Sequence, residues 1–346
     1  MPVCVGPSAS AVHIAPTLTL NSSTNYNQNS GVLNATVSAT GNRAITSVEF
    51  QWSTSASFAS GNSAWTVAST NTTIGQGTTG TTRTVTATGL TENSSTGTPY
   101  YVRFRTTNSS GFVTTSSIGG SFTTYRKIAV PFTGSSTWSN PVPSSGTSGL
   151  AITGLLNLEA RAGGASGDII FGPYGGGGGG AGARTTASSA SISGNVTVTI
   201  GAGGGYLTDL FGSPFWYPSN GNTTTIGSVL SATGGNVVVF SENGGSSGNG
   251  NAGGTGISNS NGGGGGGTNG AGANASYSAG GAGGAGWTTG YGEGGKGGEA
   301  SSSGLPTYGG AQTGNGGSGQ NGSNTVSDPN FGLGGSGYAY FEYWGP

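Results

Sequence analysis

Short runs of alternating apolar and polar residues follow one another through the first 125 residues. Ser, Asn and Gly clusters separate the runs, and a period of two is typical of β-strands that bury one face. In one run Tyr100, Val102 and Phe104 take the apolar positions, so we expect them to point inward. The residues between them, Tyr101, Arg103 and Arg105, then point outward. The predicted strands are Thr17–Leu20, Val32–Ala39, Ser47–Ser53, Arg83–Thr88, Tyr100–Thr106 and Ser117–Thr123. Such a series predicts an antiparallel β-sandwich.

The pattern changes near Tyr125–Lys127. Residues 1–125 contain 12 glycines and residues 126–346 contain 64. We therefore predict a β-sandwich domain over 15–125, preceded by an N-terminal docking arm at 1–14, and a glycine-rich domain over 126–346. Within the glycine-rich domain, strands are expected at Leu155–Ala162 and Asn195–Ile200.

Glycine in the second domain follows a period of three. Over 244–337, the frame that starts at Gly244 holds 19 of 38 glycines, the next frame 13 and the third only 6. A three-residue period is that of a polyproline-II-like helix, which has no internal hydrogen bonds. We expect several antiparallel polyglycine-II-like helices to bundle and to satisfy each other's backbone groups. The glycine-poor frame would then face outward; it carries Ala273, Ser276, Ala279, Ala282, Ala285, Asn315, Ser318 and Asn321. The alternative is a flexible low-complexity chain, which would leave the retained frame without a cause.

Charged chemistry is scarce, which excludes several classes of function. The chain has 9 basic and 10 acidic residues among 346, too few basic ones for a nucleic-acid footprint. It contains one cysteine, Cys4, and one histidine, His13, so we expect no zinc site and no cofactor. Nucleophilic triads need placed His and carboxylate partners, and we therefore expect no enzyme activity and no catalytic residues.

The segments of the first domain resemble a fibronectin type III module. The stretch 88–91 reads Thr-Gly-Leu-Thr, 97–101 reads Gly-Thr-Pro-Tyr-Tyr, 108–111 reads Asn-Ser-Ser-Gly, and 121–124 reads Ser-Phe-Thr-Thr. The stretch 48–54 is similar to the third strand of that module. The resemblance implies that Tyr100 is a corner tyrosine, whose hydroxyl binds backbone. It also implies a spacer or display role for this domain.

The second domain resembles the glycine-rich domains of bacteriophage tail and fibre proteins. The ordered motifs are Thr137-Trp138 before Pro141, the oligoglycine run at 175–180, Thr-Val-Thr-Ile-Gly-Ala-Gly-Gly at 197–204, and the block at 222–235 that ends Ala-Thr-Gly-Gly. The final stretch, 334–343, is similar to the last strand of that family. The resemblance implies a virion component that forms a homotrimer, contacts other virion proteins and attaches to a host cell-surface polymer. The N-terminus has no signal-peptide pattern and no stretch reaches 18 apolar residues, so we expect synthesis in the host cytoplasm and no membrane insertion. The polar, charge-poor composition without disulfides suits a virion component that works outside the cell; a cleaved precursor or a non-Sec export route is the alternative.

Aromatic residues in the glycine-rich domain are the candidates for receptor contact. They are Tyr206, Phe211, Phe215, Trp216 and Tyr217 in an insertion at 206–218, with Trp287 and Tyr291 further along the chain. Aromatic side chains of this kind stack on sugar rings or anchor interfaces. Burial of the insertion against the bundle or a neighbouring subunit remains the alternative interpretation.

The leading hypothesis is a minor tail, tail-tip or fibre protein of a tailed phage that contributes to host attachment. A second is a secreted bacterial adhesin, or a polysaccharide- or ice-binding protein. A third, remote hypothesis is a cell-wall depolymerase, which would require two placed carboxylates. Glu293 and Glu299 flank Lys296, and we interpret this group as a solvated loop.

Overall fold

The computed structural model describes residues 12–58, 64–70, 73–140, 156–168, 174–192, 194–208, 216–288, 291–298, 309, 313–319 and 332–345. Every regular element in these ranges is a β-strand, which confirms the predicted all-β class. No helix in the described part of the chain has the length and apolar character needed to cross a membrane. The chain divides into two compact units, of which the first consists mainly of the residues up to Ile128 and the second consists of Ala129–Asn140 and Gly154–Tyr343.

Two antiparallel sheets form the first unit. The strands are β1 (Thr17–Leu20), β2 (Gly31–Ala39), β3 (Ile45–Ser53), β4 (Thr66–Val67), β5 (Thr79–Ala87), β6 (Pro99–Asn108), β7 (Val113–Thr115) and β8 (Gly119–Thr123). One sheet has the order β1-β2-β5 and the other the order β4-β3-β6-β7, with β8 also paired to β6. The pattern missed β4 and β7, because runs of two and three residues are too short for alternation to register.

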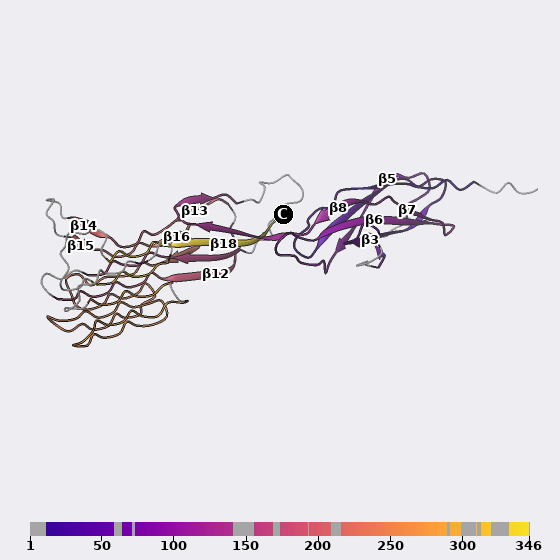
Figure 1. Cartoon of the computed structure of the whole chain (residues 1–346). Coiled ribbons are helices and arrows are strands. Elements are labelled where there is room, and N and C mark those ends of the chain that lie inside the picture. The colour runs from indigo at the N-terminus through magenta and orange to yellow at the C-terminus, as the bar shows by residue number, and fades with distance from the viewer. Residues whose placement is uncertain are drawn as a thin grey trace, which may run out of the picture. The chain divides into compact units, whose positions relative to one another are not determined.

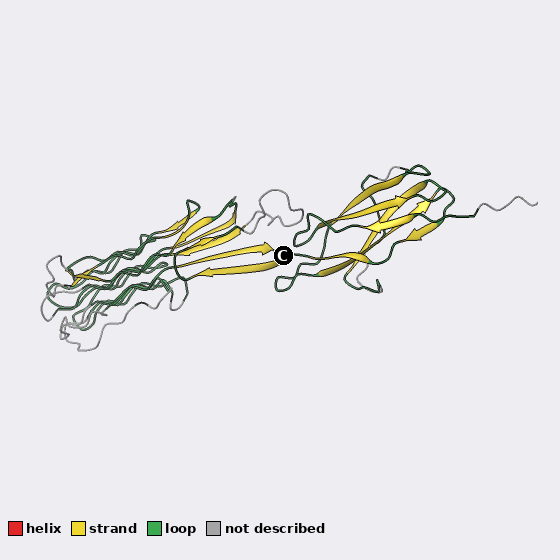
Figure 2. Cartoon of the chain, turned by 90° about the horizontal axis from the view of Figure 1, so that it is seen from above, coloured by secondary structure: helices red, strands yellow, loops and turns green. Residues whose placement is uncertain are grey.

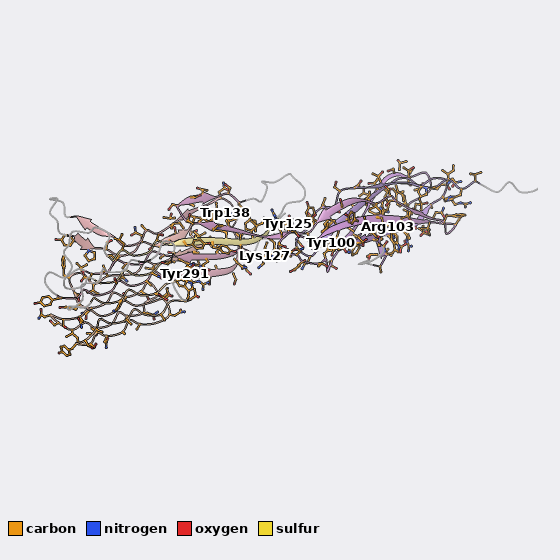
Figure 3. The ribbon with its side chains drawn as sticks, viewed as in Figure 1. Tyr100, Arg103, Tyr125, Lys127, Trp138 and Tyr291 are labelled. Carbon is orange, nitrogen blue, oxygen red and sulfur yellow. The ribbon has the colours of Figure 1, made fainter. Side chains whose placement is uncertain are left out.

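The two sheets share one hydrophobic core, to which β2 contributes Leu33 and Val37. Tyr100, Val102 and Phe104 of β6 are buried, as the alternation predicts. The Tyr100 hydroxyl accepts a hydrogen bond of 2.8 Å from the backbone N–H of Thr91, which confirms the contact expected of it. Figure 3 shows Tyr100 within this unit.

The second unit begins with two more antiparallel sheets. Its strands are β9 (Arg126–Phe132), β10 (Ser136–Trp138), β11 (Leu156–Arg161), β12 (Arg184–Ala190), β13 (Val196–Thr199), β14 (Tyr206–Thr208), β15 (Trp216–Pro218), β16 (Thr224–Ile226), β17 (Leu230–Ala232) and β18 (Tyr338–Gly345). The sheets have the orders β12-β11-β18-β9 and β10-β13-β16-β17, and β11 and β12 lie close to β17. Their shared core includes Trp138, which stacks on Phe341 with ring centroids 5.1 Å apart.

Glycine-rich segments extend from these sheets and run side by side, as the green loops of Figure 2 show. Their backbone hydrogen bonds join segments that are distant in the sequence. In the segment 175–183, Gly175, Gly178 and Ala181 donate to residues 260, 263 and 266. Gly179 and Gly182 donate to residues 317 and 314, and residues 177, 180 and 183 donate to 241, 236 and 233.

Hydrogen-bond partners therefore recur every three residues, and successive amides point to different neighbours. This is the geometry of a three-residue helix in a bundle, which we call the glycine lattice. Most neighbours are antiparallel, but 175–181 runs parallel to 260–266, because both donor and acceptor numbers rise by three. The expected antiparallel arrangement therefore applies to most neighbours but not to all of them. The segment 175–183 donates to three neighbouring segments and accepts hydrogen bonds from three others, 165–168, 245–248 and 295–298, so segments of both directions lie in contact with it.

The two runs of six glycines, 175–180 and 262–267, are buried throughout. A methyl group at Gly178 would lie 2.1 Å from the carbonyl oxygen of Gly295, and one at Gly264 would lie 1.9 Å from that of Ala282. Cβ atoms do not approach backbone oxygens so closely. These runs are the inner helices of the lattice, because their positions are buried and face the backbone of neighbouring segments, which leaves no space for a side chain.

Peripheral segments keep one outward frame. Ala273, Ser276, Ala282 and Ala285 are exposed, as predicted, and Asn315 is partly exposed. Ala279 is half-buried, and Asn321 lies outside the described residues. The prediction was wrong for Ser318, which is buried. Gly167 packs against the carbonyl oxygen of Ser318. On another side, the N–H groups of Gly316 and Gly319 donate to the carbonyls of residues 293 and 296. Neighbouring segments therefore cover Ser318.

Candidate functional site

The end of the lattice that is remote from its sheets carries the predicted aromatic insertion. Figure 1 shows β14 and β15 there, at the opposite end of the unit from β12 and β18. Tyr206 lies in β14 and Trp216 in β15; Tyr206 pairs with Pro218, and Thr208 with Trp216. Tyr217 is 38% exposed, so the structure leaves part of its ring accessible. Phe211 and Phe215 lie outside the described residues.

A second loop joins Tyr217 at this end. The rings of Tyr217 and Phe240 lie edge to face with centroids 5.4 Å apart. Phe240 and its neighbours Val238 and Val239 are each more than 40% exposed. We call these four residues, Tyr217, Val238, Val239 and Phe240, the distal patch. The second loop was not among the predicted contact residues, although Val-Val-Val-Phe at 237–240 is an unusual run in so glycine-rich a region.

Hydrogen bonds to two other segments hold the backbone beneath the distal patch. Phe240 has a φ of 55°, which bulky residues rarely adopt. The next residue, Ser241, donates its N–H to the carboxylate of Asp168, and its carbonyl accepts from the N–H of Gly177 at 3.1 Å. Asp168 is fully buried. A charge-assisted bond and a lattice bond therefore hold the base of the loop and keep its apolar side chains outside.

Trp287 and Tyr291 lie at the other end of the lattice, near the sheets, and the structure does not bring them together with the distal patch. Figure 3 shows Tyr291 close to the strands. Their rings are 6.3 Å apart, across a short turn closed by the bridge between Thr288 and Tyr291. The guanidinium of Arg161 lies 5.2 Å from the Trp287 ring, 5.4 Å from the Tyr291 ring and 4.9 Å from the Tyr338 ring. These distances are those of cation–π contacts.

Arg161 is in turn held by Glu159 of the same strand. Arg161 Nε donates to Glu159 at 2.5 Å, and Arg184 of β12 donates to the same carboxylate at 2.9 Å and 3.1 Å. Burial by itself would raise the pKa of Glu159, but hydrogen bonds from Arg184 and Arg161 outweigh it and lower the pKa. The bond to Glu159 raises the pKa of Arg184, and burial raises that of Tyr338. Glu159, Arg161 and Arg184 were not among the predicted site residues, because the pairing of β11 with β12 is needed to bring Arg184 to the other two.

The structure thus holds two surfaces of different chemistry in the second unit. The distal patch offers apolar and aromatic area, and the surface near the sheets offers an ion-pair cluster faced by aromatic rings. Among the described residues, no three His, Cys, Asp or Glu side chains group closely enough to hold a metal ion. No protein-family model matches the chain, and no curated protein matches its sequence.

Proposed function

We propose that this chain is a virion component of a tailed phage, of the minor tail, tail-tip or fibre type, which contributes to attachment to a host-surface polymer. The distal patch is the observation that carries the proposal. Its exposed side chains gather at the end of a scaffold that is cross-linked by backbone hydrogen bonds from segment to segment. A rigid support with recognition residues on its loops is a common design for binding proteins.

The energetics favour Tyr217 and Phe240 as the main contacts. Full burial of a large apolar side chain is worth about 1.5–3 kcal/mol, and each of these rings is already more than half covered. Covering the remainder of both rings would contribute about 2 kcal/mol, or roughly 30-fold in Kd. Because Asp168 and Gly177 hold the loop in place before contact, little ordering entropy opposes binding.

The test is binding of the labelled full chain to intact cells from a panel of bacterial strains. The Tyr217→Ser/Phe240→Ser double variant should bind about 30-fold more weakly than the parent to any strain that the parent binds. Val229→Ser is the matched control, because Val229 is equally exposed but lies in the turn between β16 and β17, at the sheet end. Equal binding by the double variant and the control would refute the assignment of the distal patch.

Placement in a virion needs a separate measurement. Mass spectrometry of purified phage particles should detect the intact chain, and sedimentation of the purified chain should give the mass of the homotrimer expected from the resemblance. Detection of the chain only among proteins exported by a bacterium would instead favour the secreted adhesin. Thermal hysteresis in ice-growth measurements would favour the ice-binding alternative, and release of sugars from host cell wall would favour the depolymerase.

A further inference from the structure

The outer face of the sheet β12-β11-β18 presents a regular grid of polar and aromatic side chains. Arg161 pairs with Arg184 on one side and with Tyr338 on the other. Two residues earlier, Glu159 pairs in the same way with Thr186 and Tyr340. Paired residues point to the same face of a sheet. Since Leu158, Ala160 and Phe341 fill the core on the opposite face, the grid faces away from the core.

A groove of about 380 Å³ follows this grid beyond Glu159. Its polar lining residues are Asn157, Glu159, Thr186, Ser188, Tyr340 and Glu342. They supply two carboxylates, an amide, two aliphatic hydroxyls and a phenol. This is a dense set of donors and acceptors in a chain with few charges.

The groove is polar but electrically balanced. Glu159 is bonded to both arginines, so this cluster of three charges has only one unit of excess positive charge. Glu342, the second carboxylate, offsets that unit. It accepts from Asn157 Nδ2 at 3.2 Å and from the Tyr340 hydroxyl at 3.5 Å. A ligand that carries many charges of one sign would gain little here, whereas a neutral ligand rich in hydroxyl groups would be matched.

Aromatic faces border the grid at the Arg161 end. Tyr338, Trp287 and Tyr291 surround the guanidinium of Arg161, and Tyr340 lies in the groove itself. A sugar ring has an apolar C–H face that packs on an aromatic ring, and its rim of hydroxyls hydrogen-bonds to carboxylate and amide groups. Aromatic rings and hydrogen-bonding groups therefore lie next to each other on the same face of the sheet.

We propose that this groove binds a segment of a neutral polysaccharide, with Asn157 and Glu342 bonding to its hydroxyls and Tyr340 packing on a ring face. The site is separate from the distal patch and does not rest on it. Through this groove the chain would contact surface glycan on the sheet β12-β11-β18, in addition to any contact made by the distal patch. Two weak sites on one rigid unit would strengthen attachment to a repeating polymer through effective concentration.

The experiment is an NMR titration of the full chain with neutral oligosaccharides (maltoheptaose, chitohexaose, mannohexaose and isomaltohexaose) and with oligogalacturonate as an anionic comparator. At least one neutral oligosaccharide should bind, and Asn157→Ala/Glu342→Gln should weaken that binding at least tenfold. Thr199→Ala/Ser231→Ala is the matched control, because both residues are exposed on the other sheet, and it should bind like the parent. The Tyr217→Ser/Phe240→Ser variant should also bind like the parent, which separates this site from the distal patch.

A second variant guards against misfolding. Ser188 is exposed at the rim of the groove, so Ser188→Trp should fill the groove without disturbing the core and should also abolish binding. The proposal is overturned if no neutral oligosaccharide in the panel binds, or if Ser188→Trp binds as well as the parent. It is also overturned if the groove variants change the oligomeric mass measured by light scattering, since the groove would then be a contact between copies of the chain.

Discussion

A single methyl group in the centre of the glycine lattice should weaken the second unit severely. Gly265 lies in the buried run 262–267, and its N–H donates to the carbonyl of Gly295 at 2.8 Å. In Gly265→Ala the new Cβ would lie 2.0 Å from the carbonyl oxygen of Gly179. A carbon in contact with a carbonyl oxygen normally lies about 3.3 Å away. The two segments must therefore separate by about 1.3 Å at this point.

That displacement breaks more than one contact. The oxygen of Gly179 also accepts a hydrogen bond of 2.9 Å from Gly295, so moving it leaves a buried amide without its partner. An unsatisfied buried group costs about 1–3 kcal/mol, and overpacking costs a similar amount. We expect the free energy of unfolding to fall by about 3–5 kcal/mol. For a unit of this size that corresponds to a decrease in Tm of roughly 6–20 °C.

Scanning calorimetry of the full chain measures this effect. Gly205→Ala is the matched control, because Gly205 belongs to the same lattice but nothing lies within 4 Å of its Cβ position. At such an open site the loss of unfolded-state entropy should stabilise by about 0.4–1 kcal/mol. If both variants melt at the same temperature, glycine is not required by close approach of backbones, and our account of the lattice is refuted.

Three further predictions concern single side chains. Tyr100→Phe should lower the free energy of unfolding of the first unit by about 1–3 kcal/mol in urea, because it removes the partner of a backbone N–H. Tyr101→Phe, on the outer face, should change it by less than about 0.5 kcal/mol, and equal effects would contradict the role given to the Tyr100 hydroxyl. The pKa of Glu159 in the folded state lies below its ordinary value of 4.5. The ionised Glu159 carboxylate therefore stabilises the folded state above pH 4.5, and this stabilisation is lost as the pH falls through the lowered pKa. Urea unfolding midpoints measured at several pH values test this. Glu159→Gln should have a lower midpoint than the parent at neutral pH, and the difference in midpoint should shrink in acid; a difference that is constant with pH would contradict the role of the ion pairs. Burial raises the pKa of Tyr125 from 10.0 to about 12, so its stabilising contribution is present below pH 10 and declines as the pH rises toward 12. Tyr125→Phe should remove this part of the alkaline transition, and an unchanged alkaline midpoint would show that another group controls it.

Local pattern predicted most strands of the first unit. The strand β1 has the predicted bounds, β2, β3, β6 and β8 differ by one or two residues at their ends, and β5 begins four residues before the predicted strand. The buried positions of β6 also follow from the sequence. Side chains on a strand alternate with a period of two regardless of what the strand packs against, so this information is carried by neighbouring residues. The short β4 and β7 pair with β3 and β6 over too few residues to leave such a pattern.

The candidate site was predicted only in part. Tyr217 was selected from the aromatic insertion, but its partner Phe240 stands 23 positions later and was not. Trp287 and Tyr291 were selected with it, although they contact Arg161 at the other end of the lattice. Aromatic content in a glycine-rich chain identifies residues able to bind, but it does not reveal which of them share a surface. The lattice determines which aromatic residues share a surface, because it fixes the end of the unit at which each connecting loop lies.

The sequence by itself determined the all-β class, the change in glycine content near Tyr125 and the three-residue period of the second unit. Only the tertiary structure decided which glycine segments lie inside, why Ser318 is buried although Ala273 and Ala282 of the same frame are exposed, and which loops meet at each end. The physical reason lies in the hydrogen bonds. A helix with a three-residue period has no internal hydrogen bonds, so every amide must find a partner on another segment. Its neighbours, their direction and its burial are therefore properties of the assembled lattice and not of any local stretch of sequence.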